Sequence, residues 1–256
     1  MNTKLMRRRQ KSGQVILIAV LGMALILLSA QVYVFDVHMS TFSLDSNSLS
    51  DYIAAIKLGS RNVVAGSLSN ISNSGAGSIL SANLDRWVTL VSTQSQFGRS
   101  TLTCVEEESS PYSSGVWLSW GIEGYGISSS VVQFAFNLSD REVEADLSYA
   151  VNVTTRLSVE GTYRITGIVQ KQVNVTINLY NEGSSALASQ ITVYYGALGV
   201  WLEPTDLNNY VLTDYGNGTY LASFDTFIPL PTVEVSVHAV DGRNIHVQAD
   251  AACTLV

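Results

Sequence analysis

Histidine is the side chain best suited to acid–base or metal chemistry near neutral pH, and this chain of 256 residues has three of them. His38 has no candidate partner beside it in the sequence. His238 and His246 stand on two alternating segments that flank a turn, and the apolar residues of each segment occupy the opposite strand face. Two imidazoles on neighbouring strands can bind a metal, but only Asp250 and Glu234 are near enough in the sequence to assist them. We therefore expect solvated histidines and no metal.

The turn between these two strands also predicts their register. A three-residue turn, 241–243, sets Ala239 against Ile245 and His238 against His246, so that apolar residues face one another. A two-residue turn would instead bury an imidazole beside a valine, and an unpaired buried polar group costs about 1 to 3 kcal/mol. The sequence therefore predicts the longer turn, with both imidazoles exposed.

Two further clusters have residue types that bind ligands. The acidic run Glu106–Glu108 offers carboxylates for calcium, but it lacks the alternating oxygens and the glycine turn of an EF-hand, so a solvated loop is expected. Trp117, Trp120 and Tyr125 stand among glycines; they would form a sugar platform if exposed, but buried aromatic packing is the default. The sequence contains no nucleophile elbow, phosphate loop or dinucleotide fingerprint. We expect no enzymatic activity and no cofactor.

The N-terminal part of the chain has the pattern of a membrane anchor. Residues 15–35 carry no charge, and Arg7, Arg8, Arg9 and Lys11 precede them. An apolar helix of this length spans a hydrocarbon core of about 30 Å, and flanking basic residues stay in the cytoplasm. The sequence predicts a single-pass cell-membrane protein that contacts the lipid bilayer through residues 15–35, with a cytoplasmic N-terminus and an extracellular C-terminal region.

Two other interpretations of this segment are a cleaved secretory signal and a buried helix. A secretory signal usually has an apolar run of about 7 to 15 residues and small residues before the cut, whereas this run is longer and Leu28 occupies a small-residue position. A buried helix is disfavoured because residues 15–28 are apolar on every face and have basic residues on one flank only.

Gly13 and Gln14 separate the basic cluster of residues 7–11 from the apolar residues 15–18. This junction resembles the class III signal of archaeal type IV pilin-like proteins. In that family a membrane peptidase cuts after the glycine, and the apolar helix remains as an anchor or as a filament core. The resemblance implies processing between Gly13 and Gln14. Assembling pilins commonly carry Glu as the fifth mature residue, where this chain has Ile18; a simple anchor with a coincidental Gly-Gln pair is the alternative.

Beyond residue 13 the chain is acidic. The first 13 residues hold five of the 14 basic residues and no acid, so the other 243 residues carry nine basic and 21 acidic side chains, a net charge of −12. Such a region repels nucleic acid, and no nucleic-acid partner is expected. Five Asn-x-Ser/Thr sequons in this region are candidates for glycosylation: Asn70, Asn137, Asn152, Asn174 and Asn217.

Cys104 and Cys253 are the only cysteines. An even number in an exported region predicts one disulfide, which would close a loop of about 150 residues and add about 4 to 5 kcal/mol in the entropic description. Two unpaired buried thiols are the alternative.

Apolar periodicity predicts the elements. Residues 48–71 and 78–96 have apolar side chains three and four apart, and a Ser-, Asn- and Gly-rich linker, 69–77, separates them. This pattern predicts a helical hairpin whose apolar stripes pack on each other and on the following region, or else on a partner helix. From residue 101 the period changes to two, and turn residues separate the segments, which predicts an all-β sandwich.

The segments 214–220, 233–237 and 241–243 give the C-terminal region a likeness to immunoglobulin-like domains of prokaryotic surface proteins. The expected fold class is therefore α+β, with five parts: a cytoplasmic leader (1–13), a transmembrane helix (14–36), a helical hairpin stalk (37–98), a β-rich region (99–168) and an immunoglobulin-like β-sandwich (169–256).

These features predict a membrane-anchored structural or adhesive protein of the cell surface, pilin-like and archaeal, whose partners are like subunits or other envelope proteins. The first alternative is an anchored receptor, or a carbohydrate- or partner-binding subunit of an envelope complex. An anchored hydrolase is the remaining class.

Overall fold

The computed structural model describes residues 46–94, 98–121, 123–139, 144–229 and 231–256. This part of the chain contains two α-helices, one 3₁₀ helix and 13 strands. The chain divides into two compact units, residues 1–54 and 55–256, and every strand belongs to the second unit. The fold of this second unit positions all the candidate sites described below.

The two helices are α2 (Ser46–Ser72) and α3 (Ile79–Thr93), and both occur where the apolar spacing predicts them. Ser74, with a φ of 72°, helps to reverse the chain between them. The Trp87 indole N–H donates a hydrogen bond to Ser60 Oγ (2.9 Å), which ties the pair together. The buried apolar residues repeat three or four positions apart, as one helix face requires: Ile56, Val64, Leu68 and Ile71 in α2, and Leu80, Leu84 and Val91 in α3.

The larger sheet has nine strands in the order β1-β3-β4-β5-β10-β9, with β2 beside β3, β6 beside β5 and β13 beside β4. The longest pairing in this sheet joins the antiparallel strands β3 and β4, which stay in register from Tyr125 opposite Ser158 to Ser139 opposite Glu144. The strands are β1 (Arg99–Glu106), β2 (Val116–Trp120), β3 (Tyr125–Ser139), β4 (Glu144–Ile165), β5 (Gln170–Asn181), β6 (Ser184–Ser185), β9 (Val211–Asp214), β10 (Thr219–Phe227) and β13 (Thr254–Leu255).

The smaller sheet has four strands in the order β12-β11-β7-β8. It comprises β7 (Ala188–Ala197), β8 (Val200–Leu202), β11 (Glu234–Asp241) and β12 (His246–Ala252), and the 3₁₀ helix η1 (Asp206–Asn208) follows β8. The two sheets share one hydrophobic core to which β4, β5, β7, β10, β11 and β12 contribute. Two sheets that pack across one core are compatible with a β-sandwich.

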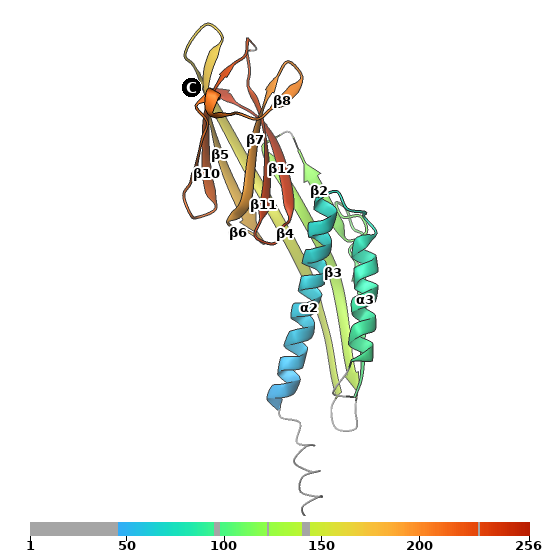
Figure 1. Ribbon diagram of the computed structural model, residues 1–256. Helices are drawn as coiled ribbons and strands as arrows, with labels where there is room; N and C mark the ends of the chain where they lie inside the picture. The colour runs from blue at the N-terminus through green and yellow to red at the C-terminus, as the bar shows by residue number, and fades with distance from the viewer. Residues whose placement is uncertain (1–45, 95–97, 122, 140–143, 230) are drawn as a thin grey trace, which may run out of the picture. The chain divides into compact units, whose positions relative to one another are not determined.

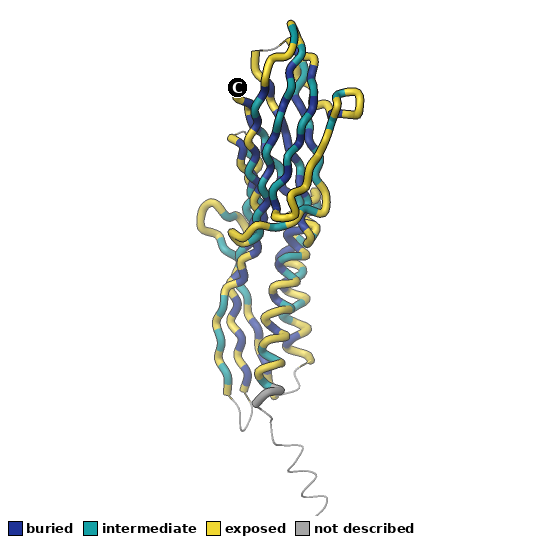
Figure 2. The backbone as a smooth tube through the Cα atoms, turned by 90° about the vertical axis from the view of Figure 1, so that its left-hand side faces the viewer, coloured by how far each residue is buried: buried dark blue, intermediate teal, exposed yellow. Residues whose placement is uncertain are grey.

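The smaller sheet covers one part of a face of the larger sheet, and the two helices cover another part of that face. On β4, the Tyr149 ring stacks on Phe134 of β3 (centroids 5.4 Å apart), and its hydroxyl shares a hydrogen bond with Ser60 Oγ of α2 (2.9 Å). The Lys57 ammonium lies 5.6 Å from the centre of this ring. Figures 1 and 2 show α2 and α3 beside one end of β3, and the smaller sheet beside the other part of the larger sheet. One sheet therefore runs through two cores.

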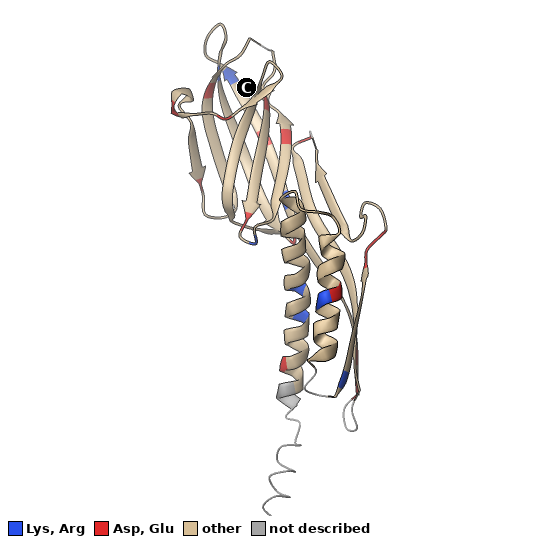
Figure 3. Cartoon of the chain, turned by 45° about the vertical axis from the view of Figure 1, so that its right-hand side comes forward, with Lys and Arg blue, Asp and Glu red and all other residues tan. Residues whose placement is uncertain are grey.

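Charged side chains are sparse and unevenly placed. Figure 3 shows basic and acidic side chains on α2 and α3, and mostly acidic side chains on the strands of the sandwich. The sequence from Gln172 to Gly242 contains no Lys or Arg. The fold therefore places a long stretch without basic residues in the sandwich.

The predicted α+β fold class is wrong. The described residues are mostly strand, they contain two helices, and neither helix is long and apolar enough to cross a membrane. The predicted transmembrane helix, residues 14–36, lies outside the described residues. The sandwich core takes Leu157, Val159 and Tyr163 from β4, so it is not confined to the expected immunoglobulin-like segment. Periodicity identifies strands, but only non-local pairing decides which of them share a sheet.

Candidate functional site

The most distinctive side-chain cluster is a row of four rings on the face of the smaller sheet that points away from the core. The row, called the aromatic row here, runs from Trp120 of β2 through His246 of β12 and His238 of β11 to Tyr194 of β7. Successive ring centroids are 5.1, 5.4 and 5.0 Å apart. The two histidine contacts with Trp120 and with each other are edge-to-face, a favourable arrangement for aromatic rings. The fold thus brings both histidines together.

The register that builds the row differs from the prediction by two residues. His238 lies opposite Gln248, and His246 lies opposite Val240. The predicted faces are retained, because a shift of two residues preserves the alternation. The turn does contain three residues, but they are Gly242, Arg243 and Asn244, and Asn244 adopts a φ of 62°. This is the geometry of a type I turn followed by a left-handed residue.

The prediction of freely solvated imidazoles is also wrong, because both rings are half-buried. Burial lowers the pKa of His238, and the nearby Asp250 carboxylate offsets part of this effect. Burial lowers the pKa of His246, and the neighbouring His238 lowers it further. His246 Nδ1 is buried without a hydrogen-bond partner. The row is therefore disposed to hold neutral imidazoles.

The row lacks the ligand set of a metal centre. Asp250 Oδ1 accepts hydrogen bonds from Ser236 Oγ (2.5 Å) and Gln248 Nε2 (3.2 Å), so it is already engaged beside the histidines. Among the described residues, no group of three or more His, Cys, Asp or Glu side chains is arranged to hold a metal ion.

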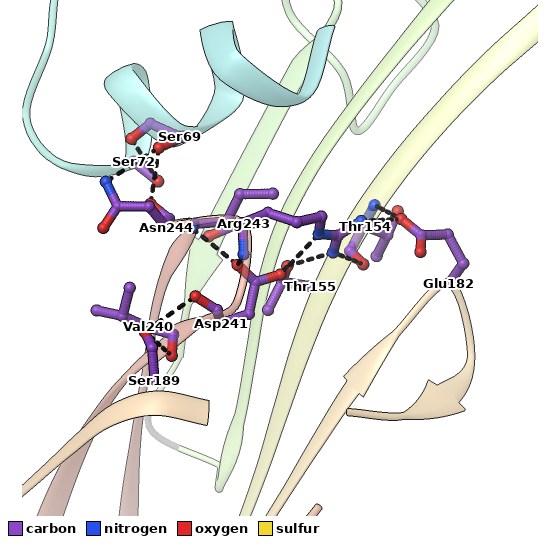
Figure 4. Close-up of polar contacts among 12 residues, drawn as sticks. Ser69, Ser72, Thr154, Thr155, Glu182, Ser189, Val240, Asp241, Arg243 and Asn244 are labelled. Atoms are coloured by element: carbon purple, nitrogen blue, oxygen red, sulfur yellow. Dashed lines mark hydrogen bonds and ion pairs between the residues drawn. The ribbon is translucent and has the colours of Figure 1, made fainter. Parts of the chain in front are cut away.

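A network of polar groups, the polar junction, holds the turn that carries His246 (Figure 4). The carboxylate of Asp241, which is fully buried, accepts hydrogen bonds from the backbone N–H groups of Arg243 (2.8 Å) and Ile245 (2.9 Å). The Arg243 guanidinium donates to Asp241 Oδ2 (2.8 Å), to Glu182 Oε1 (2.5 Å) and to Thr155 Oγ1 (2.9 Å). The turn is therefore attached to β4 and to the β5–β6 hairpin.

The same turn is attached to the end of α2. Ser69 Oγ donates to the Asn244 carbonyl (2.8 Å), and the His246 N–H donates to Ser72 Oγ (3.0 Å). Figure 4 shows these serines above the turn. The polar junction consequently fixes one end of the aromatic row relative to both the helices and the larger sheet.

The acidic run lies elsewhere and lines a hollow with Asp85 and Cys104. Burial and the Glu108 carboxylate raise the pKa of Glu106. Hydrogen bonds from Ser109 lower the pKa of Glu107, whose Oε1 accepts from the Ser109 hydroxyl (2.5 Å) and N–H (3.0 Å). The expected solvated loop is therefore found only in part, because Glu106 ends strand β1 and Glu106 and Glu107 are half-buried, whereas Glu108 is exposed.

The predicted disulfide is absent, because Cys104 and Cys253 are both free. Cys104 lies opposite Phe134, which pairs with Tyr149 of β4, whereas Cys253 Sγ lies against Gly161 of the same strand. From position 149 to position 161 the strand rises about 3.3 Å per residue, or roughly 40 Å. Bridged cysteines need Cα atoms within about 7 Å. The shared strand keeps the two thiols apart.

The three aromatic residues considered as a sugar platform do not share a face. Trp120 belongs to the aromatic row, and its indole N–H donates to Ser128 Oγ (3.2 Å). Trp117 points to the other face, where its ring meets Tyr112 edge-on with centroids 5.9 Å apart. The Arg156 guanidinium lies over the Tyr125 ring, 5.1 Å from the ring centre. The platform of three rings is therefore not formed.

The sequon asparagines fall on several surfaces. Asn137 of β3 and Asn152 of β4 are exposed on the face opposite the helices and the smaller sheet, and Asn174 of β5 is half-buried on that face. Asn217 is exposed in the β9–β10 turn, and Asn70 is exposed near the end of α2. The processing residues Gly13 and Gln14, and His38, lie outside the described residues.

Sequence reasoning missed Tyr194 and Glu182, which come from strands and turns far from the histidines in the chain. The Asp241-Gly242-Arg243 motif was visible as a turn, but its role as an ion pair was not. Neither a protein-family model nor a curated protein matches this sequence.

Proposed function

We propose that this protein is a membrane-anchored structural or adhesive protein of the cell surface, similar to archaeal type IV pilin-like proteins. The observation that carries the proposal is the order of basic residues 7–11, Gly13 and the uncharged segment 15–35 ahead of the folded part. In this proposal residues 15–35 insert into the bilayer, and the β-rich unit is displayed outside the cell. The sandwich with its helical cover is then the displayed body.

The face opposite the helices and the smaller sheet supports external display. It carries short polar side chains and the exposed sequon residues Asn137 and Asn152. Glycans at these positions would cover part of this exposed sheet face, which suits an exported surface.

A second function, an anchored receptor or carbohydrate- or partner-binding subunit, is favoured by the aromatic row. Trp120 is 37% exposed at one end of the row, and its ring meets the half-buried His246 ring edge-on. Exposed rings beside polar atoms are common in binding surfaces. Specific binding of a glycan that is lost in Trp120→Ala would favour this function.

The proposal is tested at Gly13. In membranes of the native host or an archaeal expression host, Gly13→Leu should leave unprocessed precursor, because a bulky side chain crowds the peptidase. Mass spectrometry of the N-terminal peptide should find Gln14 as the first residue of the unmodified protein and Met1 or Asn2 in the variant. Gly77→Leu is the matched control, since no atom lies within 4 Å of a Cβ there. An unmodified protein that retains residues 7–13 and is recovered in the soluble fraction would contradict the proposal.

A further inference from the structure

Exposed apolar side chains gather on the segment that runs from the β7–β8 turn to the β9–β10 turn. We call these eight residues the apolar edge. Leu207 of η1 protrudes most, with 92% of its surface exposed. Large exposed apolar surfaces on a folded protein mark sites of interaction. The apolar edge comprises Leu198, Val200, Trp201, Leu202, Leu207, Val211, Leu212 and Tyr215.

The strands of this segment also have free backbone edges. β8 is the last strand of the smaller sheet, and β9 is the last strand of the larger sheet. A terminal strand leaves N–H and C=O groups available to a partner. The ionised residues of the segment are Glu203, Asp206 and Asp214, and it contains no basic residue. The charged side chains of this segment are therefore all acidic.

A surface of opposite character lies between the two helices. Val63 and Gly66 of α2 and Asn83, Trp87 and Leu90 of α3 line a groove with a volume of about 330 Å³, and Arg86 and Asn62 complete its lining. This volume is at the small end of the range for ligand pockets, so the groove suits a single protruding side chain. Trp87 is held by its hydrogen bond to Ser60, which gives the groove a fixed wall.

This helix groove has one basic side chain, that of Arg86. Lys57 and Arg61 of α2 are directed to the larger sheet instead, where they contact the Tyr149 ring and the Glu182 carboxylate. Arg86 contacts the neutral Asn83 amide oxygen at 3.5 Å. An acidic apolar edge and an apolar groove that carries an arginine are complementary, whereas two acidic edges would repel.

We propose that the apolar edge of one copy docks on the helix groove of a second copy, with Leu207 inserted between α2 and α3 and Asp206 facing Arg86. The two surfaces differ, so the contact is head-to-tail, and the pair of copies keeps one free groove and one free apolar edge. Such a contact repeats into a line or closes into a ring. The inference rests on the proposed function in one respect, since display on a membrane is what would bring the copies together.

The experiment uses full-length chains in native membranes, carrying two different tags. One chain carries Leu207→Cys, and the other carries Gly66→Cys, a position where a new Cβ meets no atom within 4 Å. Mild oxidation should give a dimer that carries both tags. Leu187→Cys replaces Leu207→Cys in the matched control, because Leu187 is also exposed (55%) but lies outside the apolar edge. This control should give only the background set by Cys104 and Cys253.

Charge reversal tests the specific pairing. Asp206→Arg should lower the yield of the mixed dimer about tenfold, the factor that corresponds to about 1.4 kcal/mol, and Arg86→Glu in the partner should restore it. A yield no higher than that of the Leu187→Cys control, or bridging of Leu207→Cys to itself alone, would overturn the inference. The N-terminus is mapped in the same membranes. Processing at Gly13 without the mixed dimer defeats the interface alone, and the mixed dimer in soluble, unprocessed protein defeats the proposed function alone.

Discussion

The surroundings of His238 and His246 determine which protonation state their imidazoles favour. Each lies half-buried between rings, and one buried nitrogen of His246 has no partner. A charged imidazole loses solvation there, and two charged imidazoles in edge-to-face contact also repel. The aromatic row is thus a surface that is stable when both rings are neutral.

We expect the stability of the folded protein to fall as the pH drops below about 6.5, the ordinary pKa of histidine. Because burial lowers the pKa of both histidines, the unfolded chain binds more protons than the folded chain in this range, and the free energy of unfolding decreases with decreasing pH. The contribution levels off about one pH unit above 6.5, where the imidazoles are neutral in both states. Urea unfolding between pH 5 and pH 7 measures it.

The control for this measurement is the double variant His238→Gln, His246→Gln, which keeps polar side chains without a titrating ring. Its free energy of unfolding should change less over the same pH range than that of the unmodified protein. An identical pH dependence in both proteins would assign the effect to carboxylates instead.

Elements are joined in this fold by the polar junction. The β11–β12 turn meets the end of α2, the strand β4 and the β5–β6 hairpin through Asp241, Arg243 and Asn244. A fully buried carboxylate requires a partner charge or several donors, and Asp241 has both. The turn is consequently a structural centre as well as the support of His246.

Replacing Arg243 by Met should lower the free energy of unfolding by about 3 kcal/mol, because removing one partner leaves a buried charge uncompensated. Chemical denaturation measures the change. Arg243→Lys should recover part of the loss, since it restores the charge but not the planar fork of donors. Arg164→Met is the control: Arg164 is exposed and donates to Gln172 at 3.0 Å, so its loss should stay within about 0.5 kcal/mol. Equal losses in the two Met variants would contradict a special role for the polar junction.

At the scale of the second compact unit, β4 runs through both cores, and β3 pairs with it from Tyr125 to Ser139. The ends of these strands near Phe134 and Tyr149 lie against the helices, and the part of β4 near Leu157 and Val159 lies in the sandwich core. Shared strands couple the two cores, because neither can lose its strands without disrupting the other.

We therefore expect the helix pair and the sandwich to unfold together. Leu84→Ala, in the helix core, should lower the free energy of unfolding by about 2 to 5 kcal/mol and shift one common transition. Circular dichroism follows the helices, and tryptophan fluorescence follows Trp87, Trp117, Trp120 and Trp201. Leu58→Ala is the matched control, since Leu58 is 60% exposed and should have little effect. Two separate transitions, with only the first shifted by Leu84→Ala, would show that the cores are independent.

The sequence by itself determined the local properties of this protein. Apolar spacing located both helices, and alternation assigned Val237 and Ala239 to the core and the two histidines to the other face, because side-chain direction depends only on neighbouring backbone geometry. The odd length of the β11–β12 turn followed from the same alternation.

Only the tertiary structure decided which distant residues meet. The register of β11 and β12 moved by two residues because the Asp241 carboxylate closes the turn at Ile245, an effect that alternation cannot detect. The prediction of a disulfide failed because Cys104 and Cys253 lie near positions of β4 that are 12 residues apart. Periodicity is a local signal, whereas strand pairing and ion pairs depend on free-energy differences between non-local contacts, and these exist only once the chain has folded.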